Sequence, residues 1–162
     1  MTVVFDGKEF AEEIESRLTG EVSQLTGKLR RKPKIVSILV SDDPASLIYV
    51  ELKRQVAARI GVEFELAKFE AGDLAQVNRF IGAKNTDSGV DGIMVQLPLA
   101  DARGKPFSKE EQQELLDQIA PAKDVDGLRS DSKFLPATVR AVLALVDEAR
   151  RLTGCNPVRA VV

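Results

Sequence analysis

Short apolar runs along the chain have the pattern of buried β-strands. Residues 35–40 (IVSILV) and 92–97 (GIMVQL) are almost continuously apolar, which is typical of strands covered on both faces. Residues 62–69 alternate between apolar and polar positions, and residues 3–5 form a shorter apolar segment. The pattern therefore predicts four strands along this part of the chain.

Amphipathic helices are expected around these strands, because apolar residues recur at helical spacing behind typical capping residues. The expected caps are Asp6, the Ser41–Pro44 turn, Asp73, Ser108 with Glu111 in a capping box, and Thr138. The last helix, residues 139–152, should end at Gly154. Strands that alternate with helices predict an α/β fold, a three-layer α/β/α sandwich with a mostly parallel sheet.

The helix expected after Pro44 carries the most informative pattern, and it should end at Gly61. Its apolar stripe consists of Ile48, Leu52, Val56 and Ile60. Tyr49 and Lys53 lie four residues apart beside this stripe, so we expect their polar tips at the boundary between core and solvent. An amine oriented there by a phenol could exchange protons, although a snorkelling lysine beside a surface tyrosine has the same pattern.

Composition narrows the classes of function. With 23 basic and 25 acidic residues, the formal net charge of −2 favours neither nucleic acid nor a membrane surface as a partner. The chain has no signal-peptide pattern, no apolar run of membrane-spanning length and a single cysteine, so we expect a cytoplasmic protein. Because histidine is absent, serine–histidine triads are excluded, we expect no metal, and acid/base chemistry needs lysine, tyrosine or a carboxylate.

Two further candidate segments follow expected strands, at the sheet edge where open α/β folds bind ligands. Gln96 closes an apolar strand, and its amide either caps that strand or contacts a ligand. Residues 124–127 (DVDG) place two carboxylates on a turn that is either structural or accepts hydrogen bonds from a ligand. Neither a G-x-G-x-x-G nor a G-x-x-x-x-G-K-[ST] motif occurs, so the chain has no glycine-rich nucleotide loop of its own.

Four motifs in order resemble the bifunctional methylenetetrahydrofolate dehydrogenase/methenyltetrahydrofolate cyclohydrolase family. They are residues 42–46 (DDPAS) followed by Tyr49-x-x-x-Lys53, residues 91–99 (DGIMVQLPL), residues 121–127 (PAKDVDG) and residues 134–138 (FLPAT). The resemblance covers essentially the whole chain. Each motif alone is modest, whereas four in the family's order are highly specific.

The resemblance implies a role in one-carbon metabolism. The family oxidises 5,10-methylenetetrahydrofolate with NADP and hydrolyses the 5,10-methenyl product to 10-formyltetrahydrofolate. Lys53 matches the family's catalytic lysine, Tyr49 the tyrosine that stacks on the folate, and Gln96 the glutamine that tunes the lysine. Asp126 matches the aspartate that anchors the pterin ring. The expected substrate-binding set is Tyr49, Lys53, Gln96, Leu97, Pro98 and Asp126.

The chain departs from the family near the expected domain junction, where the segment after Gly127 is shorter and Pro-Cys-Thr-Pro is replaced by PATV. We expect a folate-binding catalytic domain at 1–137 and a connecting helix and linker at 138–157. Residues 158–162 would be the first strand of a missing Rossmann-type NADP-binding domain or, alternatively, an edge strand of the same sheet. The resemblance implies that the parent protein is a homodimer through that missing domain, so this segment alone would be monomeric. Because the missing domain also holds the NADP site, we expect the segment to be inactive as a dehydrogenase.

Two other hypotheses stay open at this point. One is a stand-alone or degenerate folate- or metabolite-binding module without catalysis, and the other is a flavodoxin-like domain for a small ligand unrelated to folate. The DNA beyond the codon for Val162 separates the first of these from a longer enzyme. Binding of a reduced folate separates both folate hypotheses from the last one.

Overall fold

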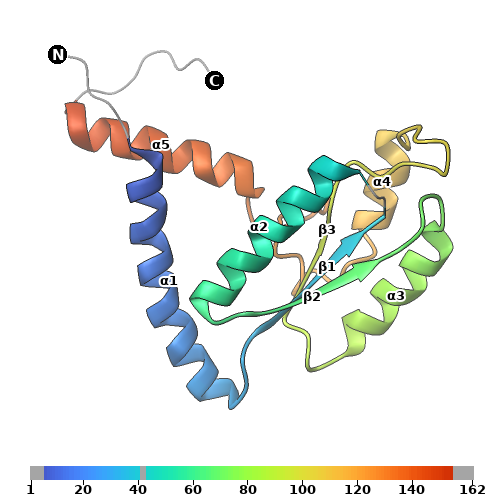
Figure 1. The fold of residues 1–162 in the computed structure, drawn as a ribbon, viewed down its shortest axis with the longest axis horizontal. Coiled ribbons are helices and arrows are strands. Elements are labelled where there is room, and N and C mark those ends of the chain that lie inside the picture. Colours follow the sequence, from blue (N-terminus) through green and yellow to red (C-terminus); the bar gives the residue numbers. More distant parts are fainter. Residues whose placement is uncertain (1–5, 41–42, 155–162) are drawn as a thin grey trace.

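The computed structural model describes residues 6–40 and 43–154 (Figure 1). In chain order the elements are α1 (Gly7–Leu29), β1 (Lys34–Leu39), α2 (Pro44–Ile60), β2 (Glu63–Lys68), α3 (Leu74–Thr86), β3 (Gly92–Val95), α4 (Lys109–Leu116) and α5 (Ala137–Thr153). The strand expected at 3–5 and the segment 158–162 lie outside the described residues. Within the described ranges, no helix is both long and apolar enough to cross a membrane.

The sheet is parallel, as the alternation of strands and helices predicts. Its described strands have the order β2-β1-β3, with Ile35 of β1 paired to Phe64 on one side and to Gly92 on the other. An isolated parallel bridge between Ile93 and Asp124 continues the sheet beyond β3. The chain returning from α4 therefore runs alongside the last strand, and this brings residues 124–127 to the same sheet edge as the end of β3.

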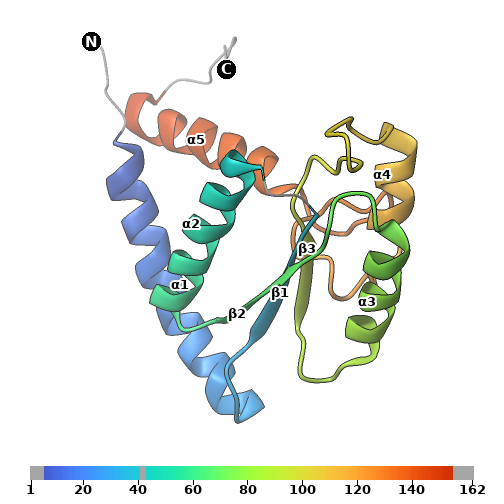
Figure 2. The same cartoon turned by 45° about the vertical axis from the view of Figure 1, so that its right-hand side comes forward.

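Helices cover the two faces of the sheet, which confirms the α/β sandwich (Figure 2). Alternate residues of β1 point to opposite faces. Val36 and Ile38 are fully buried in a core shared with α3 and α4, whereas Ser37 and Leu39 point toward α2. The remaining buried members of that core are Val40, Val77, Ile81, Val90, Ile93, Val95, Leu99, Leu115, Leu116 and Ile119.

The face that α2 buries differs from the predicted apolar stripe. Ile48 and Leu52 are 62% and 51% exposed, and the buried residues of the helix are Ser46, Val50 and Ala57. Small side chains let a helix backbone approach the sheet closely, so the larger residues flank the contact line instead of filling it. The prediction that the stripe forms the packed face is therefore wrong for Ile48 and Leu52, whereas Val56 and Ile60 are half-buried. The helix bounds and the αL cap at Gly61 (φ 87°) are confirmed.

Most helix caps lie where local sequence predicts them. Asp6 and Asp73 accept backbone N–H groups at the starts of α1 and α3, and Ser108 forms a capping box with Glu111 at α4. Thr138 is an exception, because α5 begins at Ala137 with Pro136 in the N-cap position. Within the part of the chain that the structure describes, no side chain caps that helix start.

The two outer helices are loosely attached. None of the described residues of α1 or α5 is buried. The α1 helix packs along α2, where Arg59 makes two hydrogen bonds of 2.7 Å to the Glu15 carboxylate, and this guanidinium lowers the pKa of Glu15. The α5 helix crosses the N-terminal end of α1 (Figures 1 and 2).

Candidate active site

Helix α2 positions the lysine and the tyrosine. Asp43 starts the helix by accepting the backbone N–H of Ser46 at 2.8 Å, and this hydrogen bond lowers the pKa of the Asp43 carboxyl. Two turns after Ser46, Lys53 lies beside the carboxyl end of β3 with its side chain 35% exposed. Tyr49, one turn before Lys53, is 60% exposed. The helix therefore presents a half-buried amine and an open aromatic face on one side.

Gln96 follows β3 directly and contacts the lysine. Its backbone N–H donates to the Ile38 carbonyl at 2.9 Å, so the sheet still holds its main chain. The side-chain Oε1 accepts from Lys53 Nζ at 3.3 Å, and Nε2 donates to the Leu97 carbonyl at 3.0 Å. Both ends of the amide thus have partners, and its oxygen faces the amine. The next peptide bond, Leu97–Pro98, is cis.

Asp126 contacts the lysine from the other side. Its Oδ2 lies 3.6 Å from Lys53 Nζ, and the aspartate side chain is only 18% exposed. The amine therefore lies between an amide oxygen and a carboxylate oxygen that come from distant parts of the chain. Such an amine can hold or release a proton next to a bound ligand, and the carboxylate can accept N–H groups of that ligand.

A cleft of about 290 Å³ opens over these groups. It is lined by Tyr49, Lys53, Val95, Gln96, Leu97, Asp126, Leu128, Pro136, Ala137 and Thr138. Five of the six residues predicted for the substrate site are thus together, whereas Pro98 is exposed and is not among the described lining residues. The volume is at the lower end of the range for small-molecule sites.

Sequence reasoning did not assign Leu128 or the first residues of α5 to the cleft. Leu128 directly follows the 121–127 motif, and the first residues of α5 lie in the 134–138 motif, but the chain between these motifs has no periodic pattern that would place it. Their position follows from the 124–129 turn, which folds back so closely that a Cβ on Gly127 would lie 2.6 Å from the Phe134 carbonyl oxygen. Phe134 is close to Gly127 in the chain, but the segment between them has neither helical nor strand periodicity, so the sequence pattern carries little signal for this contact.

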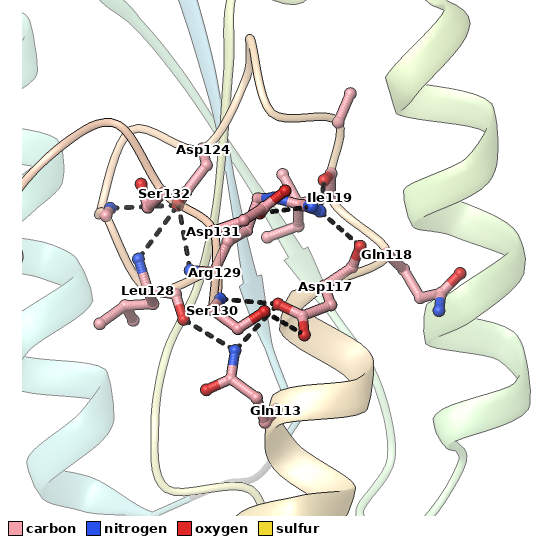
Figure 3. Close-up of polar contacts among 12 residues, drawn as sticks. Gln113, Asp117, Gln118, Ile119, Asp124, Leu128, Arg129, Ser130, Asp131 and Ser132 are labelled. Carbon is pink, nitrogen blue, oxygen red and sulfur yellow. Dashed lines mark hydrogen bonds and ion pairs between the residues drawn. The ribbon is translucent and has the colours of Figure 1, made fainter.

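The two carboxylates of the DVDG segment have different surroundings, and Figure 3 shows the hydrogen bonds that Asp124 accepts within its own turn. Asp126 faces the cleft, whereas Asp124 is 1% exposed and accepts three backbone N–H groups of its own turn. The two groups therefore do not form a shared metal site. Among the described residues, no cluster of three histidine, cysteine, aspartate or glutamate side chains has metal-binding geometry.

A larger hollow of about 570 Å³ lies between α1 and α5. Its charged lining residues include Arg151 and Glu148, which pair with each other at 2.5 Å. Among the described residues that line this hollow, no amine, amide and carboxylate converge as they do around Lys53. We therefore place the candidate site at the smaller cleft.

Comparison with known proteins yields one consistent group. Residues 5–126 match the family described as "Tetrahydrofolate dehydrogenase/cyclohydrolase, catalytic domain". The Bifunctional protein FolD of Helicobacter pylori strain J99 is 34% identical over 155 residues, which cover 90% of this chain and 51% of that protein. The chain spans about half the length of the curated relatives it matches.

Solved structures agree with the sequence relatives. A 5,10-methylenetetrahydrofolate dehydrogenase from the silkworm Bombyx mori has a TM-score of 0.79 at 32% identity, covering 93% of this chain and 53% of its own. The Trypanosoma brucei methylenetetrahydrofolate dehydrogenase-cyclohydrolase, solved with NADP cofactor and inhibitor, has a TM-score of 0.78 at 28% identity. That match covers 95% of this chain and 52% of the trypanosome chain.

Proposed function

The chain belongs to the tetrahydrofolate dehydrogenase/cyclohydrolase family through its catalytic domain, and from this premise we propose that its cleft binds a reduced folate. We assign Lys53 as the acid/base residue for hydrolysis of 5,10-methenyltetrahydrofolate. The observation that supports this assignment is the position of Lys53 Nζ, 3.3 Å from Gln96 Oε1 and 3.6 Å from Asp126 Oδ2 within one cleft.

Each group has a distinct role in the proposed reaction. Water adds to the methenyl carbon, the bond from that carbon to N5 breaks, and the formyl group stays on N10 with release of one proton. The Lys53 amine takes the proton from the attacking water and returns it to the leaving nitrogen. Gln96 holds the amine through its side-chain oxygen, Asp126 accepts N–H groups of the pterin, and Tyr49 offers an exposed ring on which the ligand can stack.

In this proposal, the residues of this chain alone do not carry out the hydride-transfer step. NADP needs a phosphate-binding loop at a strand–helix turn, and the 162 residues contain neither glycine-rich motif. The residues present therefore do not fit the cofactor. We propose dehydrogenase activity only for a protein that carries this chain together with a nucleotide-binding domain.

Hydrolysis can be followed by the loss of 5,10-methenyltetrahydrofolate absorbance, and binding by calorimetric titration with 5-formyltetrahydrofolate. We expect Lys53→Met to reduce hydrolysis to the uncatalysed rate. Asp126→Asn should weaken folate binding by about 10- to 150-fold, since a buried charged hydrogen bond contributes about 1.5–3 kcal/mol. Lys28→Met, which removes an exposed lysine near the end of α1, is the matched control. Unchanged hydrolysis by Lys53→Met would contradict the assignment.

A folate-binding module without catalysis is the second candidate. It is favoured by the openness of the described cleft, in which Tyr49 is 60% exposed, because an open cleft positions its ligand less tightly. In that case 5-formyltetrahydrofolate binds in the titration, while hydrolysis stays at the uncatalysed rate even before Lys53 is replaced. The two assays together therefore separate an enzyme from a binding module.

A further inference from the structure

Asp124 and Arg129 lie on either side of Asp126 in the same turn, and neither belongs to the reacting groups assigned above. We propose that both are positioning residues, which hold the Asp126 carboxylate against the Lys53 amine. The proposal deepens the function proposed above and rests on it for the identity of the ligand. The geometry that supports it is independent of any ligand.

Asp124 fixes the turn from inside. Its side chain is 1% exposed, and Oδ1 accepts the backbone N–H groups of Gly127 at 3.0 Å and Leu128 at 3.2 Å. Oδ2 accepts the N–H of Arg129 at 3.3 Å. A buried carboxylate with three such donors keeps the turn in one conformation, because each unmade hydrogen bond would leave a buried polar group without a partner. Along the chain, Asp126 lies between Asp124 and the three residues whose backbone N–H groups Asp124 accepts.

Arg129 fixes the far end of the turn (Figure 3). Its guanidinium is 10% exposed and donates from Nη1 to the carbonyls of Asp117 and Ile119 at the end of α4. Beside it, the Asp117 carboxylate accepts the backbone N–H of Ser130 at 2.8 Å, which lowers the pKa of Asp117. The arginine thus attaches the turn to a helix that packs in the core.

The near end of the turn is also anchored. Lys123 receives the backbone N–H of Ile93 at 2.8 Å through its carbonyl, and its amine donates to the carbonyls of Lys84 and Asp87. Both ends are therefore tied to the sheet and to helices. The position of Asp126 then depends on the internal hydrogen bonds of the turn, for which Asp124 supplies the acceptors.

If Asp124 and Arg129 had a purely structural role, replacing them would change stability but would not change the reactivity of Lys53 through Asp126. Acetylation of Lys53 by acetic anhydride distinguishes the two, because an amine held against a carboxylate reacts with the reagent more slowly than one without that contact. Mass spectrometry gives the rate relative to the exposed Lys28 in the same molecule. This readout needs no folate.

We expect Asp126→Asn to raise the relative rate at Lys53 by about two- to fivefold, the range for a partly exposed ion pair. Asp124→Asn should raise it in the same direction, and the double variant should not exceed Asp126→Asn alone. Asp101→Asn is the matched control, since Asp101 also accepts two backbone N–H groups of its own turn, at 2.9 Å each, but does not line the cleft. This control should leave the Lys53 rate unchanged.

The outcomes separate the two proposals. If Asp124→Asn leaves the Lys53 rate unchanged, or raises it equally in the Asp126→Asn background, the positioning role is overturned. If the rates behave as expected but the unaltered chain fails to bind 5-formyltetrahydrofolate, the positioning role stands and the proposed function fails.

Arg129→Lys provides a second route if Asp124→Asn does not fold. Lysine keeps the positive charge but cannot donate in the same planar fork to the carbonyls of Asp117 and Ile119. We expect a smaller rise of the Lys53 rate, about twofold, that again disappears in the Asp126→Asn background. A rise that persists in that background contradicts the proposal.

Discussion

At the scale of single residues, Gly127 has the tightest backbone requirement near the site. Its φ is +68°, and an added Cβ would lie 2.6 Å from the Phe134 carbonyl oxygen and 2.8 Å from the Leu135 carbonyl carbon. Both neighbours are backbone atoms, which cannot rotate away as a side chain could. A side chain at this position therefore encounters both conformational strain and a clash.

We expect Gly127→Ala to lower the free energy of unfolding by about 2–4 kcal/mol, combining the αL penalty with overpacking. Gly104→Ala is the control, because Gly104 has φ +77° but no described atom within 4 Å of an added Cβ. Its loss should be about 1 kcal/mol. Urea denaturation of both variants checks this difference, and equal losses would show that the close packing contributes nothing.

Asp91 should make the stability of the chain depend on pH. The Arg31 guanidinium donates to both of its oxygens at 2.6 and 2.8 Å and lowers the pKa of the carboxyl, with a further contribution from the backbone N–H of Lys34. A lowered folded-state pKa means that the stabilisation is present above the unfolded value of about 3.8. It is lost as the pH falls through the lower folded value.

Asp91→Asn should therefore cost about 1–2 kcal/mol at pH 7 and progressively less as the pH falls below 3.8. Urea denaturation across this range measures the difference from the unaltered chain. Asp147→Asn, in an exposed pair with Arg150 on α5, should change stability by a few tenths of a kcal/mol at most at either pH. A difference for Asp91→Asn that is constant across the range would contradict the linkage.

At the scale of elements, helix α4 depends on its capping box. Ser108 Oγ accepts the Glu111 N–H at 3.1 Å, and Glu111 Oε2 accepts the Ser108 N–H at 2.8 Å. Ser108→Ala should cost about 1 kcal/mol, because it leaves a helix donor without its partner. Thr19→Ala, which removes a hydroxyl from the middle of α1, should be neutral or slightly stabilising. Thermal denaturation of the two variants tests the contrast.

Element by element, the predictable features are the local ones. The caps at Asp6, Asp73 and Ser108 use side chains that contact their own helix, so sequence alone identifies them. The buried face of α2 depends instead on how closely the helix approaches the sheet. Hydrophobicity favoured Ile48 and Leu52, while packing selected the smaller residues.

The same distinction applies to the site. Parallel topology brings the ends of strands to one edge, so the meeting of Lys53, Gln96 and Asp126 could be expected once the strands were identified. The attachment of Arg129 to the end of α4 could not, because it depends on the path of a loop without periodicity. The family resemblance named the groups that contact the folate, and the structure adds the groups that hold them.

At the scale of the whole molecule, burial is concentrated in the sheet and the helices packed on it, while α1 and α5 bury little of their surface. Val36 and Ile38 of β1 are fully buried between two strands and the packed helices, whereas the described residues of α5 include none that is buried. Free energies of local opening follow such differences in burial. The backbone amides of α5 should therefore exchange with solvent long before those of β1.

Hydrogen exchange followed by NMR or mass spectrometry measures this difference. We expect amides in β1 to exchange only on global unfolding and those in α5 at least about 100-fold faster, which corresponds to roughly 3 kcal/mol of opening free energy. The exposed face of α1 should be intermediate, because Arg59 ties Glu15 to α2. Equal protection of α5 and β1 would show that α5 is packed more firmly than its exposure indicates.

The amine, the amide and the carboxylate of the cleft come from α2, the residue after β3 and the turn after α4. They are neighbours only in the native state, so a small molecule that touches all three has no comparable binding partner in the unfolded chain. Mass action then converts affinity into thermal resistance, about 2.7 kcal/mol at a ligand concentration one hundred times Kd. A thermal-shift series of reduced folates could therefore rank ligands of this cleft without any turnover.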